Sequence, residues 1–353
     1  MSWLLLFVPV AIGLELLAPE RHLLVFLASA LAILPLAGWM GRATEQLAAR
    51  LGEGVGGLLN ATFGNAAELI IAFAALRAGL HTVVKASLIG SIVGNILLVL
   101  GAAMLAGGLR HKEQHYNVAG ARSQATLLTL AAIALILPAA YRSATGAGEA
   151  EIGSLSIWIS FVLLAVYAAN LVFSLVTHPS LFAGSHEDEA AAHGSAWSTR
   201  FASGVLAAAT AAIAWMSEIL VGAIEPAGHA LGLNDAFVGV FVVAILGNAA
   251  EHATAVTAAM RNRMDLSLSI AIGSSVQVAL FVAPLLVLAS LAVGPGPMNL
   301  SFGGGGVLTV LLAVLITGQV AGDGRSDWLK GVQLLAVYVI LGLAYFFAPA
   351  ASG

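Results

Sequence analysis

Two glutamates, Glu68 and Glu251, occupy matching places in two long apolar stretches of the chain. Each ends the same sequence, Gly-Asn-Ala-Ala-Glu, and the two copies are 251 − 68 = 183 residues apart. Other residues repeat with the same spacing and without a gap, which indicates that one structural unit is used twice and presents one acid per copy. The further matched pairs are Gly56 with Gly239, Gly90 with Gly273, and Ser91 with Ser274.

Neither glutamate has a lysine or arginine within one helical turn that could neutralise it. A carboxylate at the centre of a membrane helix costs roughly 2.5–3.5 kcal/mol, so an acid kept there without a basic partner indicates a functional site. Two such acids facing each other repel, and the repulsion is relieved when one or both take a proton or when they share a metal ion. A site that alternates between these two states exchanges protons for a cation.

The residues before each acid supply oxygen atoms and space. Asn65 and Asn248 stand three residues before the acids, on the same face of a helix, and each offers a side-chain carbonyl oxygen. Gly64 and Gly247 allow the helix to break or another part of the chain to approach closely. Calcium takes about six to eight oxygen ligands at flexible distances, so this set suits calcium better than metals that prefer nitrogen or sulfur.

The next apolar stretch in each copy adds four polar residues. Ser91 and Ser274 match across the repeat, and Asn95 and Gln277 follow about one turn later. Their hydroxyl and amide groups could complete a coordination shell or pass protons. The alternative is a structural role in hydrogen bonding between helices. For the two serines, the sequence favours this role and direct ligation equally.

Three other polar residues have weaker claims to a role. His252 directly follows the second acid; it is either a proton relay or a packing histidine, since Leu69 holds the matching position in the first copy. Glu218 and Glu45 could line aqueous routes to the site, or could be capped or interfacial acids, which for Glu45 is the preferred interpretation.

The composition shows which elements must position these residues. Of 353 residues, 60% are hydrophobic and 9% are charged, and the mean hydropathy is +0.98. Soluble domains carry about 25% charged residues, so the chain is a membrane protein with several spans. It has no cysteine, which excludes disulfides and thiolate metal sites, and its net charge of −4 does not favour binding to nucleic acid. The apolar start, Met1–Ala18, is expected to be a retained span.

Hydropathy predicts an all-α integral membrane protein with eleven transmembrane helices. Ten of the 14 lysines and arginines fall in the even-numbered loops, which therefore face the cytoplasm together with the N-terminus, while the C-terminus lies outside. The expected helices lie near 2–18, 22–50, 54–79, 82–109, 117–141, 152–177, 197–224, 232–260, 266–292, 301–320 and 327–349.

The two motifs fall on the third and eighth expected helices, so the two copies must cross the bilayer in opposite directions. The interpretation is one extra N-terminal helix, 2–18, followed by two inverted five-helix repeats, 22–178 and 197–350, within a single transport domain, 1–353. An acidic cytoplasmic linker, 184–196, separates the repeats. Its adjacent acids could gather or sense cytoplasmic cations, or be a solvated charge run; they are Glu187, Asp188 and Glu189.

The paired motifs, eleven spans and acidic linker resemble the calcium/proton exchangers of the cation/calcium exchanger superfamily. The segments 60–68 and 247–252 are similar to that family's two signature segments, and 90–95 and 273–277 to its next pair. The resemblance implies alternating access, in which Glu68 and Glu251 bind calcium and protons alternately and the first and sixth spans move as a gate. It also implies that the linker acids sense cytosolic cation, and it is closest to bacterial members, which places the chain in a bacterial plasma membrane.

Several alternatives stay open. A sodium-coupled exchanger needs more oxygen ligands beside each acid, where this chain has Ala67 and Ala250, and manganese is a possible substrate of an all-oxygen site. A cation channel is less consistent with two acids supplied by one chain. An intramembrane metalloprotease would require His-Glu-x-x-His, which the sequence lacks, so we expect no enzyme and no cofactor, only transported calcium and protons in a lipid bilayer.

Overall fold

The computed structural model describes residues 2–51, 53–178 and 197–348. Over these residues the regular elements are helices except for two short strands. Nine helices of the described ranges are long and apolar enough to cross a membrane, which confirms the expected class of helical membrane protein. They are His22–Leu51, His81–His111, Val118–Thr145, Glu149–Thr177, Thr199–Ala230, Asp235–Met260, Met264–Ala289, Gly305–Asp323 and Trp328–Phe346. The predicted linker acids lie outside the described residues.

Two of the eleven expected spans are not single long helices. The expected span 2–18 is formed by η1 (Ser2–Leu6) and α1 (Phe7–Leu17), which together make a shorter apolar helix. The expected span 54–79 is divided into α3 (Glu53–Phe63) and α4 (Ala66–Arg77). The count of eleven spans and the inverted repeats therefore stay predictions.

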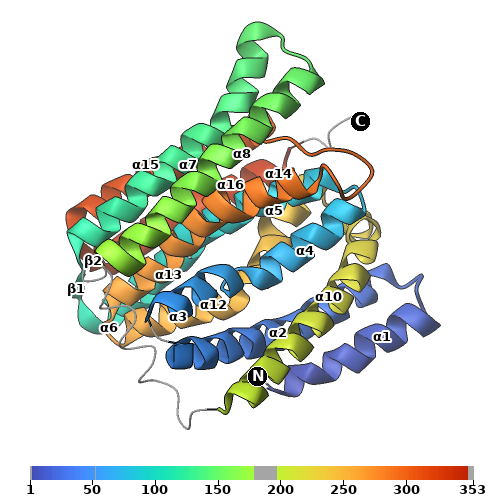
Figure 1. Ribbon diagram of the computed structural model, residues 1–353, viewed down its shortest axis with the longest axis horizontal. Coiled ribbons are helices and arrows are strands. Elements are labelled where there is room, and N and C mark those ends of the chain that lie inside the picture. Colours follow the sequence, from blue (N-terminus) through green and yellow to red (C-terminus); the bar gives the residue numbers. More distant parts are fainter. Residues whose placement is uncertain (1, 52, 179–196, 349–353) are drawn as a thin grey trace. The chain divides into compact units, whose positions relative to one another are not determined.

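The chain forms two compact units, and each is described by itself. The first comprises Met1–Ser87, Ala190–Ala250 and Tyr345–Gly353. Within it, α2 (His22–Leu51) packs against α10 (Thr199–Ala230), while α1 and α3 contact α2, and α4 contacts α10 (Figure 1). Its remaining elements are α11 (Asp235–Phe237), the π-helical segment η5 (Val238–Val243), and the first parts of α5 (His81–Val93) and α12 (Ala244–Met260).

Aromatic and polar contacts fix the start of α10 on α2. The Trp197 ring stacks on Trp39 with ring centroids 5.8 Å apart, and the Trp197 backbone N–H donates to Gln46 Oε1 at 2.9 Å. The Ser198 hydroxyl then accepts from the Phe201 N–H at 3.2 Å, which caps the helix. The start of this helix near residue 197 is thus explained by a serine cap.

The second unit comprises Leu88–Glu189 and Glu251–Ala344. In this unit α7 (Val118–Thr145) packs against α13 (Met264–Gln277) and α15 (Gly304–Asp323), and α8 (Glu149–Val172) packs against α14 (Ala283–Ala289), as Figure 1 shows. Its other elements include the π-helical segments η2 (Gly94–Val99), η3 (Phe173–Thr177) and η6 (Val278–Val282), together with α6 (Leu100–His111) and most of α16 (Trp328–Phe346).

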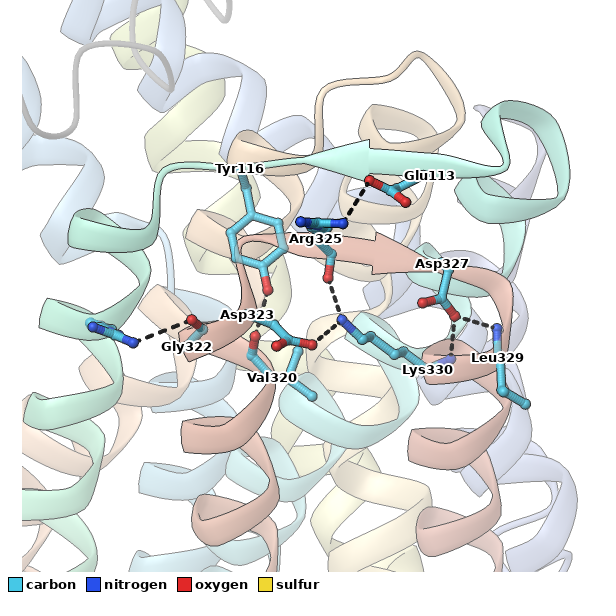
Figure 2. Close-up of polar contacts among 10 residues, drawn as sticks. Glu113, Tyr116, Val320, Gly322, Asp323, Arg325, Asp327, Leu329 and Lys330 are labelled. Carbon is cyan, nitrogen blue, oxygen red and sulfur yellow. Dashed lines mark hydrogen bonds and ion pairs between the residues drawn. The ribbon is translucent and has the colours of Figure 1, made fainter.

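A small antiparallel ribbon, which was not predicted from the sequence, closes one end of the second unit. Strand β1 (Glu113–His115) pairs with β2 (Arg325–Asp327), with Gln114 opposite Ser326. Arg325 Nη1 lies 3.8 Å from Glu113 Oε1. Figure 2 shows this pair and the Lys330 ammonium between Asp323 and the Arg325 carbonyl.

Buried side chains hold this ribbon to the helices. The Tyr116 hydroxyl donates to the Val320 carbonyl (Figure 2), and burial, with the nearby Asp323 carboxylate, raises the pKa of Tyr116 to about 12. The buried Gln114 amide donates to the Ala259 carbonyl at 2.8 Å and to Asn262 Oδ1 at 3.0 Å. The ribbon therefore also fixes the turn between α12 and α13.

Candidate functional site

The first Gly-Asn-Ala-Ala-Glu copy interrupts a helix. Helix α3 ends at Phe63, Gly64 and Asn65 form a turn, and α4 begins at Ala66. Asn65 is buried and has φ −101° and ψ 20°, outside the helical region, so it stands at the N-cap position of α4. Glu68 consequently lies in the first turn of α4, where free backbone N–H groups and the helix dipole favour a negative charge.

The second copy lies within an unbroken helical stretch that runs from Asp235 to Met260. Asn248 is buried, and its amide Nδ2 donates to the carbonyl of Ala244, one turn earlier, at 2.9 Å. The amide nitrogen is the donor in this bond, and the side-chain oxygen of Asn248 is the atom of this side chain that could ligate a cation. Glu251 lies inside the stretch, 260 − 251 = 9 residues before its end, and so beyond the last turn where the partial charges of a helix end act.

Gly247 brings the backbone of α12 against the side chain of Glu68 within the first unit. A methyl group placed on Gly247 would lie 3.1 Å from Glu68 Cγ and 3.9 Å from Ile71 Cδ1. The two expectations for the motif glycines are thus each realised once. The helix breaks at Gly64, and another part of the chain approaches closely at Gly247.

A hydrogen-bonded group in the second unit joins three of the polar residues. Asn95, fully buried in η2, donates from Nδ2 to the Ser274 hydroxyl at 3.0 Å. The Asn95 side-chain oxygen lies 3.2 Å from Nε2 of His252, which donates when the ring carries its proton there. One residue from each of three segments therefore meets here, on η2, α13 and α12.

The predicted ligands divide between the two units. Glu68, Asn65 and Asn248 belong to the first unit; Ser91, Asn95, Glu251, Ser274 and Gln277 belong to the second. Ser91 and Ser274 are both buried, whereas Gln277 and the two glutamates are half-buried. That the eight residues form one cation site stays a prediction.

Two side chains near these groups were not predicted from the sequence. Ser275 donates its hydroxyl to the Ile92 carbonyl at 3.2 Å, which joins α13 to α5 in the second unit. Gln124 Nε2 lies 3.7 Å from where a methyl on Gly273 would be. A lone amide in the apolar span 118–145 was the available signal for Gln124; no repeat marks Ser275, because Ile92 holds the matching position.

The two more distant acids have different environments. Glu218 on α10 forms an ion pair with Arg77 at the end of α4, with Arg77 Nη1 2.8 Å from Glu218 Oε1, and both side chains are more than half exposed. Arg77 was not anticipated as its partner. Glu45 is half-buried on α2.

The part of the chain that the structure describes contains no cluster of three or more histidine, aspartate or glutamate side chains able to hold a metal. A cation at the predicted residues would therefore be bound by a few carboxylate oxygens together with amide, hydroxyl and backbone oxygens. Such a mixed oxygen set is typical of calcium.

Comparison with known families gives the context of these motifs. The sequence profile of the family described as "Sodium/calcium exchanger protein" matches residues 21–176 and 201–347, which include both motif copies. The chain belongs to this family. This match and the relatives named Ca(2+)/H(+) antiporters together confirm the resemblance inferred from the motifs.

Individual relatives are similar over almost the whole chain. A Ca(2+)/H(+) antiporter of Aphanothece halophytica is 46% identical and covers 98% of this chain and 96% of its own length. A Ca(2+)/H(+) antiporter of Synechocystis sp. is 47% identical, covering 92% and 91%. The solved structure "Structure of native YfkE" is 38% identical, covers 97% of each chain and superposes with a TM-score of 0.83.

Proposed function

We propose that this member of the family is a calcium/proton antiporter that works by alternating access in a bacterial plasma membrane. The observation that carries the proposal is the pair of Gly-Asn-Ala-Ala-Glu motifs in two long apolar stretches of a chain whose relatives are named Ca(2+)/H(+) antiporters. In this proposal a calcium ion leaves Glu68 and Glu251 when protons arrive, so the two ions use the same carboxylates in turn.

The environments of the two acids support complementary roles. Glu68 lies in the first turn of α4, at the positive end of the helix dipole, which favours a negative charge there. Glu251 lies inside a continuous helix, next to His252 and its contact with Asn95. Asn65, Asn248, Ser91, Asn95, Ser274 and Gln277 are proposed to supply further oxygen atoms or to orient the groups that do.

The test is calcium uptake into proteoliposomes that contain the purified protein, with a pH gradient and a sodium gradient imposed separately. We expect the pH gradient alone to drive uptake, and the sodium gradient alone to have no effect. Uptake driven only by sodium would favour sodium coupling. Calcium movement that follows its own gradient, without counterflow, would favour a channel. Replacing calcium by manganese shows whether manganese is also a substrate.

A further inference from the structure

Gly247 has no conformational reason to be glycine. It lies in α12 with ordinary helical backbone, since the glycines with positive φ are at positions 79, 146, 232, 294 and 324 of the described chain. Glycine inside a helix is less favourable than alanine by roughly 0.5–1 kcal/mol. The helix is therefore expected to gain stability from alanine at this position, unless the side chain meets something.

A side chain at position 247 would meet Glu68, the acid of the other motif copy. A methyl on Gly247 would lie 3.1 Å from Glu68 Cγ and 4.0 Å from Glu68 Cα, whereas carbon atoms in ordinary contact are about 3.5–4.0 Å apart. The missing side chain leaves room for the first part of the Glu68 side chain. The Gly247 backbone thus forms one wall beside that side chain.

The helix has little freedom to move away from an added methyl. Eight residues earlier, at Gly239, the same helical stretch lies against α5 within the first unit. A methyl there would be 2.5 Å from Ala86 Cβ and 3.0 Å from the Val83 carbonyl oxygen. Because the backbones are in contact at Gly239, an added methyl at Gly247 is expected to displace the Glu68 side chain rather than the helix.

We propose that Gly247 is a positioning residue that holds Glu68 in the rotamer used for cation binding. The glycine of the second motif copy then serves the acid of the first, while Gly64, its counterpart, serves the helix break. This inference rests on the proposed role of Glu68. A displacement of a few tenths of an ångström in a ligand would weaken calcium binding without preventing folding.

Melting temperatures test the contact between position 247 and the Glu68 side chain without any measurement of transport. Gly247→Ala is expected to lower the melting temperature of the purified protein by about 2–4 °C. In a Glu68→Ala background, which has no Cγ, the same change should leave it unchanged or raise it. In a Glu68→Gln background, which keeps Cγ but not the charge, Gly247→Ala should again lower the melting temperature. Equal losses in all three backgrounds, or a failure of all three to fold, would overturn the proposal.

Transport then tests the positioning role. In proteoliposomes Gly247→Ala should raise the calcium concentration for half-maximal uptake about tenfold with a smaller change in maximal rate. Gly222→Ala, on an α10 position with no atom within 4 Å of an added methyl, is the matched control and should behave as wild type. Wild-type uptake by Gly247→Ala contradicts this inference alone. Wild-type uptake by Glu68→Gln contradicts the proposed function itself.

Discussion

The same five residues, Gly-Asn-Ala-Ala-Glu, adopt two different backbones in this chain. The first copy ends one helix and begins another, while the second lies inside a continuous helix. Residues before the motif differ accordingly. Thr62, whose hydroxyl bonds back to the Leu58 carbonyl at 2.8 Å, is matched by Ile245 in the second copy. Such back-bonding slightly destabilises and often bends helices, but it does not by itself break one, since Thr44 makes the same bond inside the unbroken α2.

A repeated motif can thus repeat its chemistry without repeating its geometry. Glu68 gains the electrostatic effect of a helix N-terminus, and Glu251 gains a neighbouring histidine in place of Leu69. The two carboxylates therefore share their chemistry but differ in their surroundings. Substitutions can separate the shared carboxylate chemistry from the effects of the helix break and of the histidine.

The largest effect is expected where the copies agree. Glu68→Gln and Glu251→Gln each keep the side-chain size and remove the exchangeable proton and the charge, so each should lower pH-driven calcium uptake at least ~100-fold. The measurement is initial uptake in proteoliposomes, with circular dichroism showing that both variants remain helical. Wild-type rates in either variant would contradict the assignment of that glutamate.

The asparagines test the difference in backbone. Asn65→Ala, at the helix break, should raise the calcium concentration for half-maximal uptake about tenfold. Asn248→Ala should raise it about two- to threefold, because it removes one candidate ligand oxygen while the continuous helix around it stays intact. Calcium titrations of uptake check both values. Equal effects would show that the helix break does not distinguish the two copies.

A histidine follows the acid only in the second copy, so replacing His252 tests what this neighbour of Glu251 contributes to transport. His252→Leu, which installs the residue found in the first copy, loses the contact with Asn95 and should weaken calcium uptake about threefold to tenfold. His252→Gln can still donate to the Asn95 oxygen and should recover most of that loss. If the glutamine variant is as impaired as the leucine variant, the histidine does more than hold Asn95.

The smallest effect is expected at the ion pair between Arg77, at the end of α4, and Glu218. Arg77→Gln or Glu218→Gln removes a pair whose side chains are both more than half exposed, and such pairs contribute about 0–1 kcal/mol. We expect calcium uptake to change at most twofold. Any decrease should be smaller at high salt than at low salt, because salt screens the exposed pair. A loss comparable to that of the motif glutamates would place this pair in the transport route.

Much of the fold followed from composition and patterning. Nine expected spans appear as helices with nearly the expected bounds, because a run of apolar residues in a bilayer has few alternatives to a helix. The ribbon of β1 and β2 was not predicted, since three-residue strands leave no periodic signal and depend on pairing across the sequence.

Prediction of the candidate site was less complete, for a physical reason. The repeat identified Glu68, Glu251 and their asparagines, because an uncompensated acid in an apolar stretch is rare. It could not show that Gly64 breaks its helix while Gly247 adjoins Glu68, since both glycines permit either outcome. The link from His252 through Asn95 to Ser274 also depends on packing between segments far apart in the chain.

The most direct test of the account measures calcium uptake and proton release together, in the same sodium-free proteoliposomes. Wild-type protein should show both fluxes rising together as calcium is added, and both should be lost in Glu68→Gln and in Glu251→Gln. Calcium uptake without proton release, or coupled fluxes that persist in either glutamate variant, would contradict calcium/proton exchange at the two motif acids.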